Sequence, residues 1–226
     1  MLTVVIPTLN AERHLGRTLS SLVEAAMRGF VRDVVIADGG STDATEAIAD
    51  AAGADLVRAK RGRGSQLAAG ANAAKGPWLL FLHADTALEK GWETEASDFI
   101  DRAGFENHAA VFTYALDDFA RSARRLERLV KWRCRLLALP YGDQGLLISK
   151  RFYDRLGGYA DMPLMEDVDI IRRIGRKHLH ILNSRAVTSA DRYRKDGYLL
   201  RPLRNASIIT LYAAGVPPRV LARLYG

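Results

Sequence analysis

A regular alternation of two sequence patterns in the first half of the chain is the strongest constraint on its fold. Apolar runs of strand length alternate with segments of helical periodicity. The predicted strands are Thr3–Pro7, Asp33–Ala37, Leu56–Arg58 and Trp78–Leu82, and the predicted helices are Ala11–Arg28, Asp43–Ala52, Ser65–Lys75 and Gly91–Ala103. This order predicts an α/β fold with a mostly parallel sheet and helices on both of its faces.

The second half of the chain is less regular. Strands are predicted at Ala110–Ala115, Gly145–Ser149 and His178–Leu182, and a long helix is predicted near Ala120–Leu137. No linker, repeat or low-complexity segment separates the halves. We therefore expect one domain over residues 1–226, made of a half of about residues 1–115 and a half of about residues 116–226.

Positive charge is concentrated in two stretches. The chain carries 33 Lys and Arg against 26 Asp and Glu, a formal charge of +7. Residues 121–135 contain seven cations and one acid, and so do residues 192–226, which leaves the rest of the chain net negative. Because the charge is local, it indicates basic patches and argues against a nucleic-acid-binding protein.

The sequence also bounds the cellular setting. Cys134 is the single cysteine, so no internal disulfide can form and a reducing compartment is expected. The first ten residues lack a basic leader with a long apolar core. No run approaches the roughly 20 apolar residues of a membrane span. We expect a cytoplasmic protein that is soluble or bound peripherally to a membrane.

Polar residues follow three of the predicted strands. Thr8 and Asn10 follow the first, Asp38 ends the second, and Asp85 follows the fourth. The carboxyl ends of parallel strands share one edge, where ligands bind, so these side chains are expected to converge. Two structural alternatives stay open: Asn10 could cap the next helix, and Asp38 could serve only the Gly-Gly turn after it.

Asp43, followed by Glu46 three residues later, has the spacing of a capping box and predicts a structural role at a helix start.

The ligand expected at the strand ends is a metal-bound diphosphate. The dinucleotide fingerprint is incomplete, because Leu67 stands where its third glycine belongs, and a Walker loop is missing. Acidic side chains suit a hard divalent cation. Arg61 and Arg63, on a Gly-rich turn before a helix, suit the anion, or else belong to a solvated loop.

Four motifs, in this order and spacing, resemble the inverting family 2 glycosyltransferases of the GT-A fold, in their small single-domain bacterial form. The resemblance covers about the whole chain. The motifs are VVIPTLNAE from Val4, IADGGSTDAT from Ile36, GRGSQLAAGANAAKGPWLLFLHADT from Gly62 and MEDVDIIRR from Met165.

The resemblance implies transfer of one sugar from a nucleoside diphosphate sugar, with UDP as the expected nucleotide, to an acceptor hydroxyl with inversion. The residues implied to bind the donor are Pro7, Thr8, Asn10 and Asp38 at the nucleoside, Arg63 and Gln66 at the ribose or phosphate, and Arg192 near the expected lid.

The resemblance also implies a metal ligand and a base. Asp85 would bind Mn²⁺ or Mg²⁺, and Asp167, with Glu166 as the second candidate, would deprotonate the acceptor hydroxyl. Inversion is a single displacement, which independently needs a neutralised leaving diphosphate and a carboxylate base on the opposite face. The acids of MEDVD could instead match the positive end of a helix dipole.

The metal motif departs from the family pattern. Asp-x-Asp is common there, and here His83 replaces the first acid. Alternation along the strand puts His83 and Asp85 on the same side. His83 could be a ligand for Mn²⁺, a residue that orients Asp85, or a core histidine. The Gln-x-x-Arg-Trp motif of processive members is absent, which favours a single transfer.

The acceptor side is less defined. Asp143 and Gln144, in the sequence YGDQG, are expected to line an acceptor pocket, although an ordinary Gly-flanked turn is an equal alternative. The identity of the acceptor stays open.

Two other functions compete with glycosyl transfer. A nucleotidyltransferase acting on sugar phosphates shares related topology, but would need a Gly-rich, Arg-bearing loop where this chain has PTLNAERHLG. A non-enzymatic module that binds an anionic surface would rest on the two basic stretches alone.

The helix predicted near residues 120–137 has two faces. Its basic face comprises Arg121, Arg124, Arg125, Arg128, Lys131 and Arg135, and its apolar face comprises Phe119, Ala123, Leu126, Val130, Cys134 and Leu137. The basic face is either solvated or, with Trp132 among its cations, in peripheral contact with anionic lipid.

Overall fold

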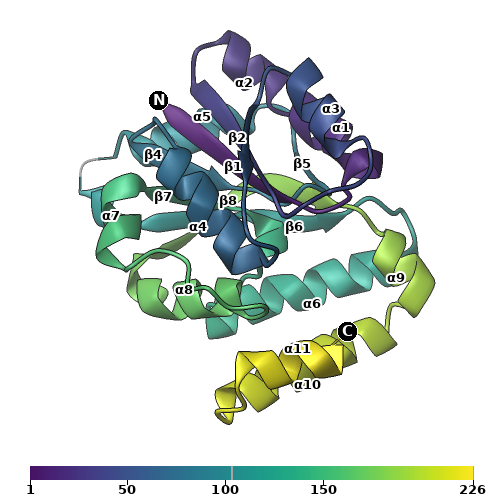
Figure 1. Ribbon diagram of the computed structural model, residues 1–226. Coiled ribbons are helices and arrows are strands. Elements are labelled where there is room, and N and C mark those ends of the chain that lie inside the picture. Colours follow the sequence, from purple (N-terminus) through teal and green to yellow (C-terminus); the bar gives the residue numbers. More distant parts are fainter. Residues whose placement is uncertain (103, 226) are drawn as a thin grey trace.

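In the residues that the structure describes, 1–102 and 104–225, eight strands form one central sheet with helices on both faces (Figure 1). This structure is a computed structural model. The strands are β1 (Leu2–Thr8), β2 (Val31–Asp38), β3 (Asp55–Arg58), β4 (Trp78–Phe81), β5 (Thr86–Leu88), β6 (Ala109–Leu116), β7 (Leu146–Ser149) and β8 (Leu179–Thr188). The helices are α1 (Glu12–Ser20), α2 (Val23–Met27), α3 (Thr45–Ala51), α4 (Arg63–Ala73), α5 (Trp92–Ile100), α6 (Arg121–Leu137), α7 (Lys150–Arg155), α8 (Glu166–Ile174), α9 (Asp191–Asp196), α10 (Leu200–Ala213) and α11 (Pro218–Tyr225).

The strand order is β3-β2-β1-β4-β7-β6-β8-β5. The first four of these strands run parallel. β7 is antiparallel to β4 and to β6, β8 is parallel to β6, and β5 is antiparallel to β8. The predicted mixed, mostly parallel sheet is confirmed, and the carboxyl ends of β1, β2 and β4 lie at one edge.

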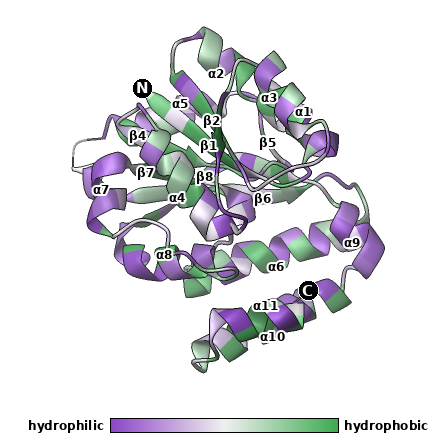
Figure 2. Ribbon diagram, viewed as in Figure 1, coloured by the Kyte–Doolittle hydropathy of each residue, from purple (hydrophilic) through white to green (hydrophobic). Residues whose placement is uncertain are grey.

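Two apolar layers cover the two faces of the sheet. Successive side chains of a strand point to opposite faces, so Ile6 packs in one layer with Leu15 of α1, and Val5 packs in the other with Leu67 of α4. Gly70 lets α4 lie close to the sheet, because a Cβ there would be 2.3 Å from Val5 Cγ1. Burial on both faces explains the apolar run of β1, and Figure 2 shows apolar colour along the central strands.

The first predicted helix is two helices, α1 and α2. Residues 21–22 form a turn between them. Ser21 Oγ donates to Thr18 O (2.7 Å) and accepts from Leu88 N–H (3.1 Å), so this polar side chain interrupts the helical pattern. The helix predicted at Gly91–Ala103 ends at Ile100, and Ala103 lies outside the described residues.

The capping box expected at Asp43 is present in part, and Asn10 does not cap α1. Asp43 Oδ1 accepts from the N–H of Thr45, the first residue of α3 (3.0 Å), whereas Glu46 pairs with Arg58 and does not reach back to the helix start. α3 follows Ala44, and Asp43 Oδ2 accepts from Glu12 N–H (3.0 Å) while Glu12 Oε2 accepts from Ala44 N–H (3.0 Å). Asn10, at φ +52°, accepts on Oδ1 from Thr42 N–H (2.9 Å). These bonds fasten the start of α1 to the start of α3, beside the end of β1.

The amphipathic prediction for α6 is confirmed in its centre and wrong at its ends. Ala123, Leu126, Val130 and Cys134 are buried. Phe119 and Leu137 were expected on the same face, but they are 97% and 63% exposed. Phe119 precedes the first turn and Leu137 ends the last one, so neither packs into the cluster beneath the helix.

Among residues 1–102 and 104–225, no helix combines the length and the apolar composition that a bilayer crossing requires.

Candidate active site

Two adjoining cavities open along the carboxyl edge of the sheet. The β1-side cavity has a volume of about 380 Å³, and the α8-side cavity has a volume of about 140 Å³. Both are lined by Arg63, His83, Asp85, Leu164 and Arg192. Because they share this wall, the two cavities form one cleft with two compartments.

The β1-side cavity is built from the end of β1 and the start of α4. Pro7, Thr8, Asn10 and Gln66 line it, as the sequence predicted. Gln66 is 5% exposed, and its Nε2 donates to Thr8 O (2.6 Å) and Ala37 O (2.9 Å). This amide therefore holds the ends of β1 and β2 together. Asn10 lies in the left-handed region, which asparagine tolerates better than most residues.

Asp38 lies behind this cavity and faces neither compartment. It is 0% exposed, and it accepts hydrogen bonds of 2.5–2.8 Å from Thr8 Oγ1, Gly40 N–H, Ser41 N–H and Ser41 Oγ. Burial alone raises the pKa of Asp38, but the bonds from Ser41, Thr8 and Gly40 outweigh it and lower the pKa below its ordinary value. Asp38 therefore holds the turn after β2, and its contact with the donor stays a prediction.

His83 and Asp85 follow β4 and belong to the wall that the two cavities share. Burial, aided by the charges of Arg63 and Arg192, lowers the pKa of His83 to about 4, so its imidazole is neutral near pH 7. The ring packs on Gly142, where a Cβ would lie 2.6 Å from His83 Nε2.

The metal-binding side chains of His83 and Asp85 fit a cation that a bound ligand also coordinates. Among the residues described, no three His, Cys, Asp or Glu side chains gather closely enough to hold a metal on their own. Asp85 supplies one carboxylate and His83 one imidazole. A hard divalent cation that binds one or two protein carboxylates completes its shell with phosphate oxygens and water.

The first two of the three acids of MEDVD, Glu166 and Asp167, begin α8, after Met165 in a left-handed conformation (φ +71°). Asp167 Oδ2 accepts from Gly142 N–H (2.9 Å). Glu166 is 1% exposed, and its Oε1 lies 3.3 Å from Arg63 Nη1. Burial raises the pKa of Glu166, and the charge of Arg63 offsets part of that rise. Both acids line the α8-side cavity and not the β1-side cavity.

Of the two predicted acceptor residues, only Asp143 faces the α8-side cavity. Its Oδ1 is buried and has no hydrogen-bond partner within the described residues, and burial raises its pKa to about 6. Gln144 is 1% exposed, donates from Nε2 to Phe112 O (2.9 Å) and accepts on Oε1 from Cys134 Sγ (3.1 Å). Both ends of the Gln144 amide are thus bound inside the fold and the residue does not line the α8-side cavity, so its acceptor role stays a prediction.

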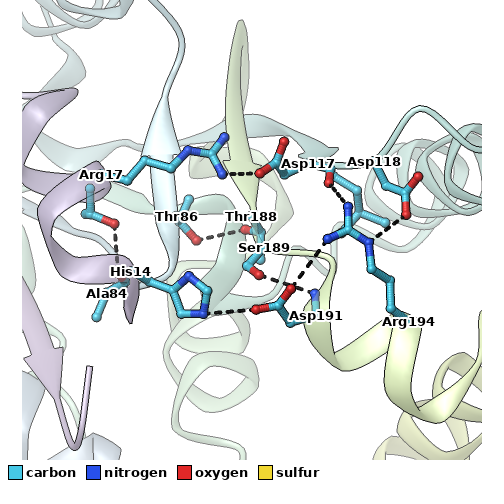
Figure 3. Close-up of polar contacts among 12 residues, drawn as sticks. His14, Arg17, Ala84, Thr86, Asp117, Asp118, Thr188, Ser189, Asp191 and Arg194 are labelled. Carbon is cyan, nitrogen blue, oxygen red and sulfur yellow. Dashed lines mark hydrogen bonds and ion pairs between the residues drawn. The ribbon is translucent and has the colours of Figure 1, made fainter. Parts of the chain in front are cut away.

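The exposed Arg192 reaches both cavities from α9, and Figure 3 shows how α9 is held. His14 Nε2 of α1 lies 3.3 Å from Asp191 Oδ2. Arg194 Nε donates to Asp118 Oδ2 (3.1 Å), after the end of β6. The short helix is thus clamped between α1 and β6 by polar contacts, which sets where Arg192 meets the cleft.

Apart from Tyr193, which follows Arg192 near the expected lid, sequence reasoning missed the apolar wall of the α8-side cavity. The wall is formed by Tyr141, Leu164, Met165, Tyr193, Ile208 and Ile209. These residues come from segments that are distant in the chain, so no local spacing joins them. The neighbouring Ile208 and Ile209 in the basic C-terminal stretch were the available signal.

Known proteins are similar to this chain in sequence and in fold. Residues 3–157 match the model of the family described as Glycosyl transferase family 2. A PGL/p-HBAD biosynthesis glycosyltransferase of Mycobacterium bovis (strain BCG / Pasteur 1173P2) is 35% identical over 95 residues, which cover 39% of this chain and 36% of that protein. The chain thus spans about a third of the length of the curated relatives it matches.

Solved structures share the fold. Glucosyl-3-phosphoglycerate synthase from Mycobacterium tuberculosis, crystallised with Mg²⁺ and UDP, is 20% identical with a TM-score of 0.59, over 83% of this chain and 70% of that one. The same enzyme with Mn²⁺, UDP and phosphoglyceric acid gives a TM-score of 0.56 at 21% identity, over 81% and 68%. The α/β sheet described above is therefore that of GT-A glycosyltransferases. Since the family match covers more than half of its length, this protein belongs to glycosyl transferase family 2.

Proposed function

We propose that this protein transfers one sugar from a nucleoside diphosphate sugar to a hydroxyl group of a separate acceptor, with inversion at the anomeric carbon. One observation carries the proposal: Asp85 and His83 line both compartments, whereas Glu166 and Asp167 line the α8-side cavity alone. A single displacement needs the leaving group and the base on opposite sides of the anomeric carbon. The division of the cleft into two compartments supports this arrangement.

The donor diphosphate belongs in the β1-side cavity, near the shared wall. Arg63, the first residue of α4, and Arg192 bring positive charge to that wall. The start of α4 adds the positive end of a helix dipole. Asp85, with His83 beside it, would hold Mn²⁺ or Mg²⁺, which neutralises the leaving diphosphate when bound. The similar synthase, crystallised with UDP and either ion, supports this choice of ligand.

Asp167 is the better candidate for the base. The N–H groups of Gly142 and Val168 bind Asp167 Oδ2 (2.9 Å) and Oδ1 (2.8 Å), and they hold the carboxylate at the α8-side cavity. Glu166 is buried against Arg63, so it orients that cation toward the shared wall. Asp143 adds an unpartnered oxygen that can accept a hydrogen bond from an acceptor hydroxyl.

Incubation with UDP-glucose and Mn²⁺, followed by identification of the nucleotide released, tests the reaction class. Glycosyl transfer or slow hydrolysis releases UDP, whereas a nucleotidyltransferase given added pyrophosphate would transfer UMP to it and release UTP and glucose 1-phosphate. With a labelled donor and cell extract as the source of acceptor, the anomeric configuration of the product distinguishes inversion from retention.

Calorimetry of UDP binding tests the metal site. Asp85→Ala should abolish the Mn²⁺-dependent part of the affinity, and His83→Ala should weaken it modestly, because imidazole is a usable ligand for Mn²⁺ and a poor one for Mg²⁺. If His83→Ala loses binding as completely as Asp85→Ala, the histidine is a full ligand. Equal UDP affinity with and without chelator would remove the metal from the proposal.

A further inference from the structure

α6 exposes a second apolar stripe on the side that faces away from the sheet. Leu129, Trp132 and Leu136 are 60%, 64% and 59% exposed. Their spacing of three and four residues places them on one face of the helix. Other residues form the buried face of α6, so this stripe takes no part in packing against the sheet. A contiguous exposed apolar patch of this kind marks an interaction site.

Cations border the stripe. Arg125, Arg128, Lys131 and Arg135 are all exposed. The ion pair of α6 within the described part of the chain joins Arg124 to Glu127 and involves none of these four. Their charge is therefore available to a partner. Together the stripe and the four cations form a surface that we name the α6 face.

The C-terminal helices repeat this combination at the same end of the molecule (Figure 1). α10 packs against α11, and Figure 2 shows apolar and polar segments alternating along both. Their fully buried side chains, among those described, are Ile208 and Leu221. Leu199, Leu200, Leu203, Leu211 and Leu224 in this region are exposed, at 72%, 70%, 56%, 38% and 57%. The C-terminal stretch from residue 192 carries seven Lys and Arg and one acid.

Charge and apolar exposure together select the partner. A second copy of the chain in a two-fold dimer would bring the same cationic face against itself, which is repulsive. Nucleic acid would use the cations but would leave the exposed leucines in water. A bilayer with anionic headgroups satisfies both, because apolar side chains enter the acyl boundary while flanking Lys and Arg meet the headgroups.

We propose that the α6 face, extended by α10 and α11, docks on an anionic lipid surface. This inference does not depend on the proposed sugar transfer. Docking places Trp132 in the headgroup region, where indole rings gather. Each bordering cation contributes roughly fivefold to the partition coefficient near an anionic surface, and the contribution falls with salt.

Intrinsic tryptophan emission provides the assay. The chain has three tryptophans, and Trp78 and Trp92 are 7% and 1% exposed, so a change on adding vesicles reports Trp132. We expect a blue shift and co-sedimentation with vesicles of phosphatidylcholine mixed with phosphatidylglycerol, and neither with phosphatidylcholine alone. High salt should reverse the binding.

Matched variants locate the surface. Leu129→Ala with Leu136→Ala should lower the partition severalfold, and Lys131→Gln should lower it roughly fivefold. Met27→Ala, which removes an 84% exposed side chain from α2, should leave it unchanged, as should Arg151→Gln on α7. The thermal midpoint of each variant confirms folding.

Three results would overturn the proposal. The first is equal binding to neutral and anionic vesicles, and the second is vesicle binding that the α6 variants do not reduce. The third is a change in Trp132 emission on adding a single-stranded oligonucleotide, or on raising the protein concentration, when vesicles cause no change.

Discussion

Replacing Gly64 with alanine should force α4 away from the segment that leads to Glu166 and Asp167. Gly64 is the second residue of α4, and a Cβ there would lie 2.2 Å from Ala160 O and 3.1 Å from Met162 O. Ordinary van der Waals contact begins at 3.4 Å, so the helix and the segment must separate by about 1.2 Å, the difference between 3.4 and 2.2 Å. The obstacle is backbone, which cannot rotate away as a side chain would.

Overpacking of this kind costs about 1–3 kcal/mol in the free energy of unfolding. For a chain of this size each kcal/mol lowers Tm by about 2–4 °C, so a drop of roughly 2–12 °C is expected. Arg63 and Glu166 meet across the same contact at 3.3 Å. The separation therefore also moves the two walls of the cleft apart, and a misplacement of about 1 Å can lower turnover about 10²-fold.

Calorimetry of Gly64→Ala beside Gly16→Ala gives a matched comparison. Gly16 lies in α1, is exposed and would have no atom within 4 Å of a new Cβ, so alanine there should stabilise by roughly 0.5–1 kcal/mol. The two substitutions should therefore shift Tm in opposite directions. A Gly64→Ala protein that melts at or above the wild-type temperature, with full turnover, would refute this reading of the contact.

Three further outcomes are expected. Asp167→Asn should lower sugar transfer by about 10²-fold or more while Mn²⁺-dependent UDP binding is kept, because a general base acts on the acceptor; a parallel loss of UDP affinity would assign Asp167 to the donor site. Arg194→Ala, which frees α9 from Asp118, should raise the KM for the donor severalfold, and an unchanged KM would show that the clamp does not position the cleft. Burial lowers the pKa of His108 and His180, and the charge of His108 adds to the effect on His180, so their contribution to stability is lost as pH falls below about 6.5. In urea titrations the free energy of unfolding of His180→Phe should accordingly rise relative to that of the wild type as pH is lowered from about 7.5 to about 5.5. A difference between the two free energies that stays constant with pH would contradict this.

The parallel half of the sheet could be predicted because its signal is local. Strands buried on both faces read as continuous apolar runs, and the polar residues that follow them mark a common edge. Pro7, Asn10, Gln66 and Asp85 accordingly lie where they were expected. β5 was missed because three residues carry no periodicity. β8 was predicted only as far as Leu182, because the polar Asn183 and Ser184 interrupt the apolar pattern. The part of β8 that pairs with β5 lies beyond this interruption.

The partners of polar side chains could not be predicted, because they come from elsewhere in the chain. In the sequence Gln144 looks like a pocket residue, yet Phe112 O and Cys134 Sγ bind both ends of its amide. Asp38 looks like a ligand, yet the turn that follows it takes up its oxygens. A hydrogen-bonding side chain in a strand-end motif can stabilise the fold or bind a substrate equally well. Its neighbours in the three-dimensional structure decide between the two roles.

The pairing of β5 with β8 has a consequence for how the protein is made. Thr86 Oγ1 and Thr188 Oγ1 lie 2.7 Å apart although 102 residues separate them, and Ser189 N–H donates to Asp85 O (2.9 Å). On the ribosome the four parallel strands are complete once residue 81 has emerged. The segment between β4 and β5, which carries Asp85, can be fixed only after β8, the last strand, has been made. Such long-range pairing forms slowly. A nascent or truncated chain that ends before β8 can therefore have its nucleotide-side strands in place and still lack an anchored Asp85, so catalytic competence arrives late in synthesis.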